Sequence, residues 1–153
     1  MDRRRGDALP GGRRRPPVVG RVRLGVLYGL RRSEILALRW DDIDRSARTL
    51  RVDEGLVPTR GGATWTNAKN PRSRRLVPLD ADTLRLLERR RREQVDERLL
   101  AGSEWVDHDL VMTTRTGGPV MPRSFDRGLA RLVHKAGLPE LSAHGLRHTV
   151  LAA

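Results

Sequence analysis

Several residue types are scarce or missing in this 153-residue sequence. It contains no cysteine, which excludes disulfide bonds and thiolate metal sites. Aromatic residues make up only 3% of the chain, so a hydrophobic core has to be built from Leu, Val, Ile and Ala. No apolar run approaches the length of about 18 residues that a transmembrane helix needs. The sequence therefore predicts a cytoplasmic protein with no membrane partner.

Lysine is scarce as well, and the basic charge is carried by another residue type. Of the 31 basic residues, only Lys69 and Lys135 are lysines, and all the others are arginines. The 19 acidic residues leave a net charge of +12 and an isoelectric point of about 11.6. Isoelectric points above about 9 are typical of domains that bind nucleic acid. A genome that favours arginine codons would produce the same composition, so the charge alone leaves both explanations open.

Two histidines give the nearest approach to a metal-binding pattern. His144 and His148 are four residues apart, as in the zinc-binding sequence H-E-x-x-H, but Gly145 stands where that pattern requires glutamate. We therefore expect no metal and no cofactor. No pattern for a small-molecule substrate is present either.

The chain divides into a short tail and one domain. Residues 1–17 contain two arginine triplets and a proline pair with almost no apolar side chains, which predicts a disordered basic N-terminal tail. Such a tail either contacts phosphates or is simply solvated. Residues 18–153 are enough for one domain and too few for two.

Apolar residues recur at helical spacing in five segments. The first predicted helix ends at Gly29, and the second begins with Ser33 as its N-cap and ends near Trp40. A long polar helix is predicted to start at Asp80 or Asp82. Its expected apolar stripe consists of Leu84, Leu87, Val95 and Leu99, with Glu88 paired to Arg92. The last two predicted helices begin at Ser124 and Ser142.

Between residues 49 and 79 the apolar spacing changes to the alternation that is typical of strands. Short alternating runs occupy residues 50–52, 56–57, 64–66 and 75–78, and Pro78 is expected to end the last one. Glycine and proline pairs separate the runs, which predicts a small three-stranded antiparallel sheet joined by hairpins. The order of helices, sheet and helices indicates a mostly helical α+β fold.

The last predicted helix carries the clearest candidate site. His144, Arg147 and His148 lie at i, i+3 and i+4, so they share one face in the first turn of the helix. Free backbone N–H groups and the positive end of the helix dipole attract anions there. The same spacing also suits a solvated polar face beside a helix cap, and spacing alone does not decide between the two.

Three segments, in order, resemble the sequence boxes of the tyrosine recombinase (phage integrase) family. Gly29–Trp40 resembles its first arginine box, G-L-R-x-x-E-L-x-x-L-x-W, with Ile35 at the usual leucine position. Lys69–Leu79 resembles its hairpin box, K-T-x-x-S-R-R-x-V-P-L, with Asn70 at the threonine position. His144–Thr149 resembles its H-x-L-R-H-T box. The resemblance implies the catalytic domain of that family, without its terminal helices, over residues 18–153.

The resemblance also implies a chemistry, which is metal-free phosphoryl transfer during DNA integration and recombination through a phosphotyrosine. Arg31 and Arg147 match the two arginines that hold the phosphate oxygens, a task that suits a planar guanidinium. His144 matches the histidine that assists proton transfer. Lys69 matches the lysine that protonates the leaving oxygen, and lysine can release a proton where arginine cannot.

The remaining predicted residues surround this catalytic set. Arg72, Arg74 and Arg75 on the hairpin are expected to contact the DNA backbone. Glu34 and His148 are expected to give structural support, with Glu34 beside an arginine. The partner implied is double-stranded DNA, together with further recombinase protomers on the same DNA.

The nucleophilic tyrosine of the family has no counterpart in this sequence. The only tyrosine, Tyr28, stands directly before Gly29 in the first arginine box and is expected to pack against the core. The sequence therefore predicts a truncated DNA-binding fragment that does not cleave DNA alone. One alternative is a working recombinase whose tyrosine is supplied by another chain. The other is a basic helix-turn-helix or RNA-binding module, in which Arg31, Lys69 and Arg147 would be scattered over the surface.

Overall fold

The computed structural model describes residues 18–67, 71–135 and 137. Predictions for the tail at residues 1–17, for Lys69 and for the helix that was expected from Ser142 lie outside the described residues. The helices and strands, in chain order, are α2 (Val18–Tyr28), α3 (Arg32–Ala37), η1 (Trp40–Asp42), β1 (Ile43–Asp44), β2 (Thr49–Val52), β3 (Glu54–Thr59), β4 (Gly62–Asn67), η2 (Pro71–Ser73), β5 (Arg75–Pro78), α4 (Ala81–Ala101), η3 (Gly102–Glu104) and α5 (Pro122–Lys135).

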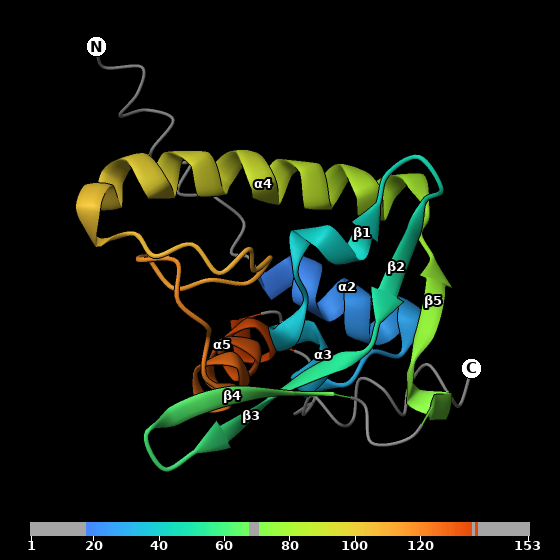
Figure 1. Ribbon diagram of the computed structural model, residues 1–153, viewed down its shortest axis with the longest axis horizontal. Coiled ribbons are helices and arrows are strands. Elements are labelled where there is room, and N and C mark those ends of the chain that lie inside the picture. The colour runs from blue at the N-terminus through green and yellow to red at the C-terminus, as the bar shows by residue number, and fades with distance from the viewer. Residues whose placement is uncertain (1–17, 68–70, 136, 138–153) are drawn as a thin grey trace.

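Helices α2, α3 and α5 are packed in the middle of the molecule, with strands along two of its borders (Figure 1). Figure 1 shows α4 along one edge, the strands β1, β2 and β5 beside the start of α4, and the β3–β4 hairpin on the side away from α4. One apolar core joins α2, α3, the strands and α5. Its most buried members are Leu24, Leu30, Ile35, Leu36, Ala37, Leu50, Leu56, Val111, Met112, Phe125 and Leu129. This arrangement confirms the predicted mostly helical α+β fold.

The predicted three-stranded antiparallel sheet is present, but its membership differs from the expectation. Its strand order is β1-β2-β5, with Leu50 opposite both Ile43 and Val77. Strands β3 and β4 form a separate two-stranded sheet, so β2 pairs with β5 across the hairpin and not with β3. The pairing of β2 with β5 buries Leu50 and Val77 against the core. Pro78 ends β5, as expected.

The aspartate-rich segment between α3 and β2 contains η1 and β1. The carboxylate of Asp42 is used inside the fold there. Its Oδ2 accepts a hydrogen bond from the backbone N–H of Arg39 at 2.9 Å, and its Oδ1 accepts one from Arg51 at 3.0 Å. An aspartate that binds the local backbone in this way favours a tight 3₁₀ turn that leads directly into a strand.

Two helix starts differ from the expected ones. Helix α3 begins at Arg32 and not after Ser33, because the Glu34 carboxylate accepts the backbone N–H of Arg31 and stabilises the earlier start. Helix α5 begins at Pro122, two residues before Ser124, and proline suits the first turn of a helix. Gly29 ends α2 at a φ of +66°, which confirms its predicted role as a C-cap.

The apolar stripe predicted for α4 is wrong in its second half. Asp80 caps the helix, as expected, but Val95 and Leu99 are 56% and 75% exposed. The face turned to the core instead carries Arg90 and Gln94. These two side chains are buried because they bind the backbone of residues 110 and 111. Arg90 Nε donates to the Val111 carbonyl at 3.0 Å, and Gln94 Nε2 donates to the Leu110 carbonyl at 2.8 Å.

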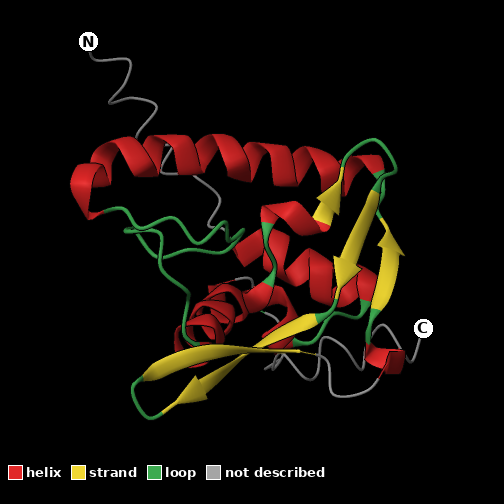
Figure 2. Ribbon diagram, in the orientation of Figure 1, coloured by secondary structure: helices red, strands yellow, loops and turns green. Residues whose placement is uncertain are grey.

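These polar contacts hold a segment that has little regular structure of its own. Figure 2 shows residues 105–121 as a loop between η3 and α5. The backbone N–H of Val111 donates to the Leu38 carbonyl at 3.0 Å, and Arg39 forms an isolated antiparallel bridge with Leu110. Residues 110 and 111 therefore lie between α4 and the end of α3. The buried side chains of Arg90 and Gln94 donate hydrogen bonds to the carbonyl groups of these two residues, which are not in a strand.

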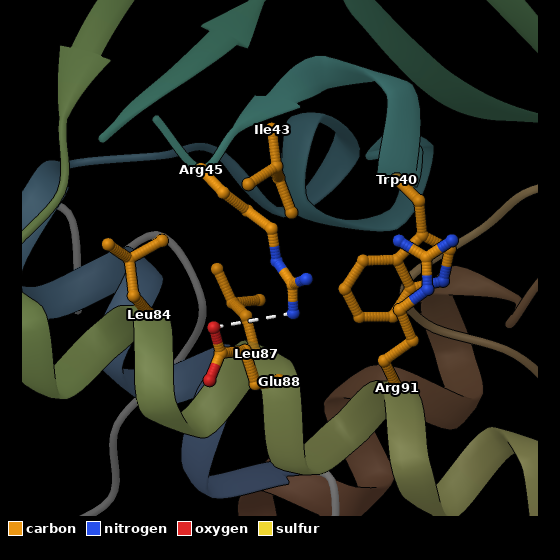
Figure 3. A pocket seen from close by; sticks show the side chains of 7 residues that line it. All are labelled: Trp40, Ile43, Arg45, Leu84, Leu87, Glu88 and Arg91. Atoms are coloured by element: carbon orange, nitrogen blue, oxygen red, sulfur yellow. Dashed lines mark ion pairs between the residues drawn. The ribbon is translucent and has the colours of Figure 1, made fainter. Parts of the chain in front are cut away.

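An ion pair and contacts of the Trp40 indole ring attach the η1–β1 segment to α4 (Figure 3). The Arg91 guanidinium lies 5.1 Å from the centroid of the Trp40 ring, a cation–π contact. Arg45 forms an ion pair with Glu88 at 3.3 Å, so the predicted Glu88–Arg92 pair is wrong. The indole N–H of Trp40 donates to Gln94 at 2.8 Å. The space between these side chains is about 20 Å³, large enough for a single water molecule and no ligand.

No helix within residues 18–67 and 71–135 is both long and apolar enough to cross a membrane.

Candidate functional site

Arg31 lies at the start of the first arginine box, between the end of α2 and the start of α3. The turn at Gly29 and the buried side chain of Leu30 fix the backbone ahead of it. Arg31 itself is exposed, with an extended backbone at φ −73° and ψ 154°. In the described part of the chain, its guanidinium makes no hydrogen bond or ion pair. Its charge is therefore presented to solvent at a position that the backbone fixes.

Glu34 connects this arginine to the hairpin box. One carboxylate oxygen accepts the backbone N–H of Arg31 at 2.8 Å and lies 3.2 Å from Arg75 Nη2. The other oxygen lies 2.9 Å from Arg75 Nη1, so the guanidinium binds both oxygens. The Glu34 side chain is only 8% exposed, and that of Arg75 is 30% exposed. Glu34 therefore lies beside an arginine, and that arginine is Arg75.

The three hairpin arginines are in different environments. Arg75 is engaged by Glu34 and also donates to the Ser73 carbonyl at 3.0 Å. Arg72 in η2 and Arg74 just before β5 are exposed. The structure thus brings Arg31, Glu34 and Arg75 together and leaves two hairpin arginines at the surface nearby. Lys69, His144, Arg147 and His148 lie outside the described residues.

Helix α5 carries a basic face that the sequence interpretation did not identify. Arg123, Arg127 and Arg131 follow one another at i, i+4 and i+8, and all three are exposed. The opposite face is buried through Phe125, Leu129 and Val133. The signal was available in the sequence, because the arginines alternate with the apolar residues that predicted the helix.

An ion pair joins α5 to the arginine box. Arg32, the residue after Arg31, lies 2.6 Å from the carboxylate of Asp126, whose neighbour in the sequence is Arg127. Asp126 lies beside the arginine row and is already paired. Asp126 is the one acidic residue within residues 122–135, and its carboxylate pairs with Arg32 and not with the three exposed arginines. We refer to Arg123, Arg127 and Arg131 as the α5 arginine row.

Tyr28 is held in a network at the start of α4. Its hydroxyl lies 2.9 Å from Asp80 Oδ1 and 3.0 Å from Thr83 Oγ1, and it accepts the backbone N–H of Asp80 at 3.0 Å. Its ring packs against the core, as the sequence predicted. Hydrogen bonds from Thr83, then from Tyr28 and Arg23, hold the pKa of Asp80 well below its usual range. The carboxylate therefore stays ionised and keeps the phenol engaged.

The chemistry open to this surface is the binding of an anion. Within the described residues, Arg31 and the α5 arginine row have no acidic partner, and their guanidinium groups offer planar sets of donors that match phosphate oxygens. Among the described residues, no group of three or more His, Asp or Glu side chains could hold a metal ion.

The comparison with known proteins begins with the fold. The structure superposes on the Tn1549 transposon integrase in complex with transposon right-end DNA with a TM-score of 0.70 and 21% identity, over 87% of this chain and 44% of that chain. For XerA recombinase the TM-score is 0.59 at 21% identity, over 86% of this chain and 40% of that chain. The fold is that of a tyrosine recombinase catalytic domain.

The sequence comparisons identify the family. The model of the phage integrase family matches residues 20–153, so the chain belongs to this family. A XerC-like tyrosine recombinase of Caldanaerobacter subterraneus subsp. tengcongensis is 29% identical over 133 residues, which cover 79% of this chain and 34% of that protein. An integrase of Saccharopolyspora erythraea is 28% identical, over 82% of this chain and 41% of that protein. The chain thus spans between a third and a half of the length of these relatives.

Proposed function

We propose that this chain is a DNA-binding part of a site-specific recombinase and that the α5 arginine row contacts the DNA backbone. The observation that carries the proposal is the row itself, with Arg123, Arg127 and Arg131 exposed at i, i+4 and i+8, while the carboxylate of Asp126 on the same helix is paired with Arg32. The major groove of B-DNA admits an α-helix, and arginines along one face of that helix reach the phosphates beside it.

The arginine box contributes a second part of the same surface. Arg31 is exposed, and the Arg32–Asp126 ion pair joins the start of α3 to α5. In the phosphoryl transfer that the family resemblance implies, an arginine at the position of Arg31 stabilises charge on the non-bridging oxygens. For that task the backbone that carries the guanidinium has to be fixed before DNA arrives. The hydrogen bond from the Arg31 backbone to the buried Glu34 carboxylate supports this role.

The solved relatives support DNA as the ligand. The Tn1549 integrase structures were determined in complex with transposon DNA, and XerH recombinase was determined bound to its difH substrate. The XerH match has a TM-score of 0.56 and covers 88% of this chain. Family membership favours a recombinase over the RNA-binding or helix-turn-helix alternative.

We also propose that these 153 residues do not supply the nucleophile for strand cleavage. Tyr28 is their only tyrosine, and its hydroxyl is engaged by Asp80 and Thr83 at the start of α4. A phenol that attacks phosphate has to be free to approach it beside the arginines. A tyrosine from another segment or another protomer would then complete the reaction.

DNA binding is tested by the salt dependence of the affinity for a labelled DNA duplex, measured by fluorescence anisotropy. We expect a dissociation constant on the order of 10⁻⁴–10⁻⁶ M near physiological salt for non-specific DNA. Replacing the α5 arginine row with glutamines should reduce the slope of log K against log salt by about 2.7, because each phosphate contact contributes about 0.9.

The matched control removes the same charge from another helix. Arg85, Arg92 and Arg98 on α4 are exposed, and their joint replacement by glutamine should leave the slope within error of the parent chain. An equal loss of slope in both triple variants would indicate a non-specific effect of net charge and would contradict the proposed surface. Tighter binding to an RNA duplex than to DNA would contradict DNA as the ligand.

The nucleophile is tested with a nicked suicide duplex, scored for covalent protein–DNA adduct on a denaturing gel. Addition of a tyrosine-bearing C-terminal segment from one of the longer relatives should permit an adduct that is absent without it. A covalent adduct formed by this chain alone, and lost in Tyr28→Phe, would show that the proposal is wrong.

A further inference from the structure

Helix α4 carries a regular row of exposed side chains on the face that points away from the core. Arg85, Arg89, Arg92, Asp96 and Leu99 follow one another at i, i+4, i+7, i+11 and i+14, and all five are exposed. Figure 1 shows the other labelled helices and strands on one side of α4. Alternating steps of four and three residues are the spacing with which two helices pack along each other. We refer to these five residues as the outer α4 row.

The charges of α4 are divided between its two ends. Residues 81–92 contain five arginines and two carboxylates, whereas residues 93–101 contain three carboxylates and one arginine. Glu104 in η3 adds an exposed carboxylate just beyond the acidic end. If two copies of α4 packed in parallel, like charges would lie opposite each other. In the antiparallel orientation, the basic half of each helix would lie opposite the acidic half of the other, and such charge patterns determine the orientation of paired helices.

Two charges in the outer α4 row have no partner within the described part of the chain. Arg92 and Asp96 are both exposed, and neither forms a hydrogen bond or an ion pair with another described residue. In an antiparallel pair of helices with its two-fold axis near residue 94, Arg92 would lie opposite Asp96 of the second copy. The symmetry of the pair forms this contact twice. Each copy would therefore supply the partner that the other lacks.

The acidic end of α4 also carries exposed leucines, and the basic end carries a hollow that could receive them. Leu99 and Leu100 are 75% and 83% exposed. Beside the basic half of the helix lies a shallow hollow of about 580 Å³, lined by Leu86 and by several arginines that include Arg89. About the same two-fold axis, position 99 of one copy would lie opposite position 89 of the other. The leucines would then leave water against Leu86 and the aliphatic stems of the arginines.

We propose that the outer α4 row is a self-association surface, on which two copies of this chain pair through antiparallel α4 helices. The same residues of both copies form the contact, as in other two-fold dimers. A single pair of 21-residue helices belongs to the small, transient interfaces that bury less than about 1,200 Å². We therefore expect a dissociation constant on the order of 10–100 µM. The contact uses no residue of the α5 arginine row, so it goes beyond the proposed DNA surface and does not depend on it.

The test is sedimentation equilibrium of the whole chain without DNA, over a range of protein concentrations. The weight-average mass should rise from 17.3 kDa towards twice that value as the concentration increases. Asp96→Arg and Arg92→Glu each place like charges opposite each other at two symmetric points. Each should therefore weaken the association at least about tenfold. The double variant, Arg92→Glu with Asp96→Arg, reverses both charges and should restore the association of the parent chain.

The matched control is Asp41→Arg, which makes the same change of charge at an exposed residue of η1 and leaves α4 intact. It should associate like the parent chain, and weaker association would mean that net charge and not the outer α4 row is responsible. A parent chain that stays monomeric about tenfold above the expected dissociation constant would overturn the inference. So would a double variant that associates as weakly as the single ones. Because no DNA is present, failure of the proposed function would leave these outcomes unchanged.

Discussion

Substitution of Glu34 by glutamine tests the connection between the arginine box and the hairpin. Glu34→Gln keeps the size of the side chain and one carbonyl oxygen, which can still accept the backbone N–H of Arg31. The amide nitrogen replaces the oxygen that faces Arg75 Nη1 at 2.9 Å. A donor would then face a guanidinium, which has no acceptor.

The expected cost follows from the burial of the pair. A hydrogen bond to a charged group contributes about 1.5–3 kcal/mol, and breaking a fully buried ion pair costs about 3–5 kcal/mol. Glu34 is 8% exposed, but Arg75 at 30% can recover part of its hydration. We therefore expect Glu34→Gln to lower the free energy of unfolding by about 2 kcal/mol, near the lower of these two ranges.

The assay is urea denaturation of four chains in a double-mutant cycle, namely the parent, Glu34→Gln, Arg75→Gln and the double variant. Groups in direct contact show coupling energies of about 0.5–3 kcal/mol, and we expect at least 1 kcal/mol here. Additive effects, with a coupling below about 0.3 kcal/mol, would refute the direct ion pair as the connection between the two boxes.

Three further predictions concern the rest of the fold. Hydrogen bonds, from Thr83 above all, lower the pKa of Asp80 in the folded protein. The contribution of Asp80 to stability should therefore be complete above the unfolded pKa of about 3.9 and should be lost as the pH falls towards the folded pKa. In an acid titration followed by circular dichroism, the stability of Asp80→Asn should depend less on pH than that of the parent chain. Gly117→Ala should destabilise the protein by more than about 1 kcal/mol in thermal unfolding, because φ is +88° and the new Cβ would lie 2.3 Å from the Val106 carbonyl oxygen. Leu99→Lys should change the unfolding free energy by less than about 0.5 kcal/mol, and a loss of 2 kcal/mol would show that this exposed side chain is buried in solution.

The elements with strong local signals could be predicted from the sequence. Gly29 and Asp80 mark helix ends through backbone freedom and through a capping carboxylate, and both act within a few residues. Phe125, Leu129 and Val133 define α5 by spacing alone. Such signals need no knowledge of what the helix packs against.

The misassigned parts depend on contacts between distant residues. Arg90 and Gln94 face the core of the protein because residues 110 and 111 offer unpaired carbonyl groups there, and no local pattern in α4 reveals those groups. The pairing of β2 with β5, across the whole hairpin, is non-local in the same way. Leu99 was therefore predicted to be a core residue from the spacing of its sequence neighbours, although it is exposed in the structure.

The candidate site was predicted mainly through the family resemblance. That resemblance placed Arg31, Glu34 and Arg75 in two boxes about 40 residues apart along the sequence, and the structure brings them into contact. The α5 arginine row is not part of any of the three sequence boxes. It becomes apparent only when the buried face of the helix is known and the opposite face can be examined for charge.

The most direct test of the proposed DNA surface is arginine footprinting with a dicarbonyl reagent, read by peptide mass spectrometry with and without a DNA duplex. Nearly all basic residues are arginines, so the reagent reports on almost the whole basic surface. We predict protection of Arg31 and of the α5 arginine row, with unchanged modification of Arg85, Arg92 and Arg98 on α4. Protection of the α4 arginines, with Arg31 and the α5 arginine row still fully reactive, would contradict the account.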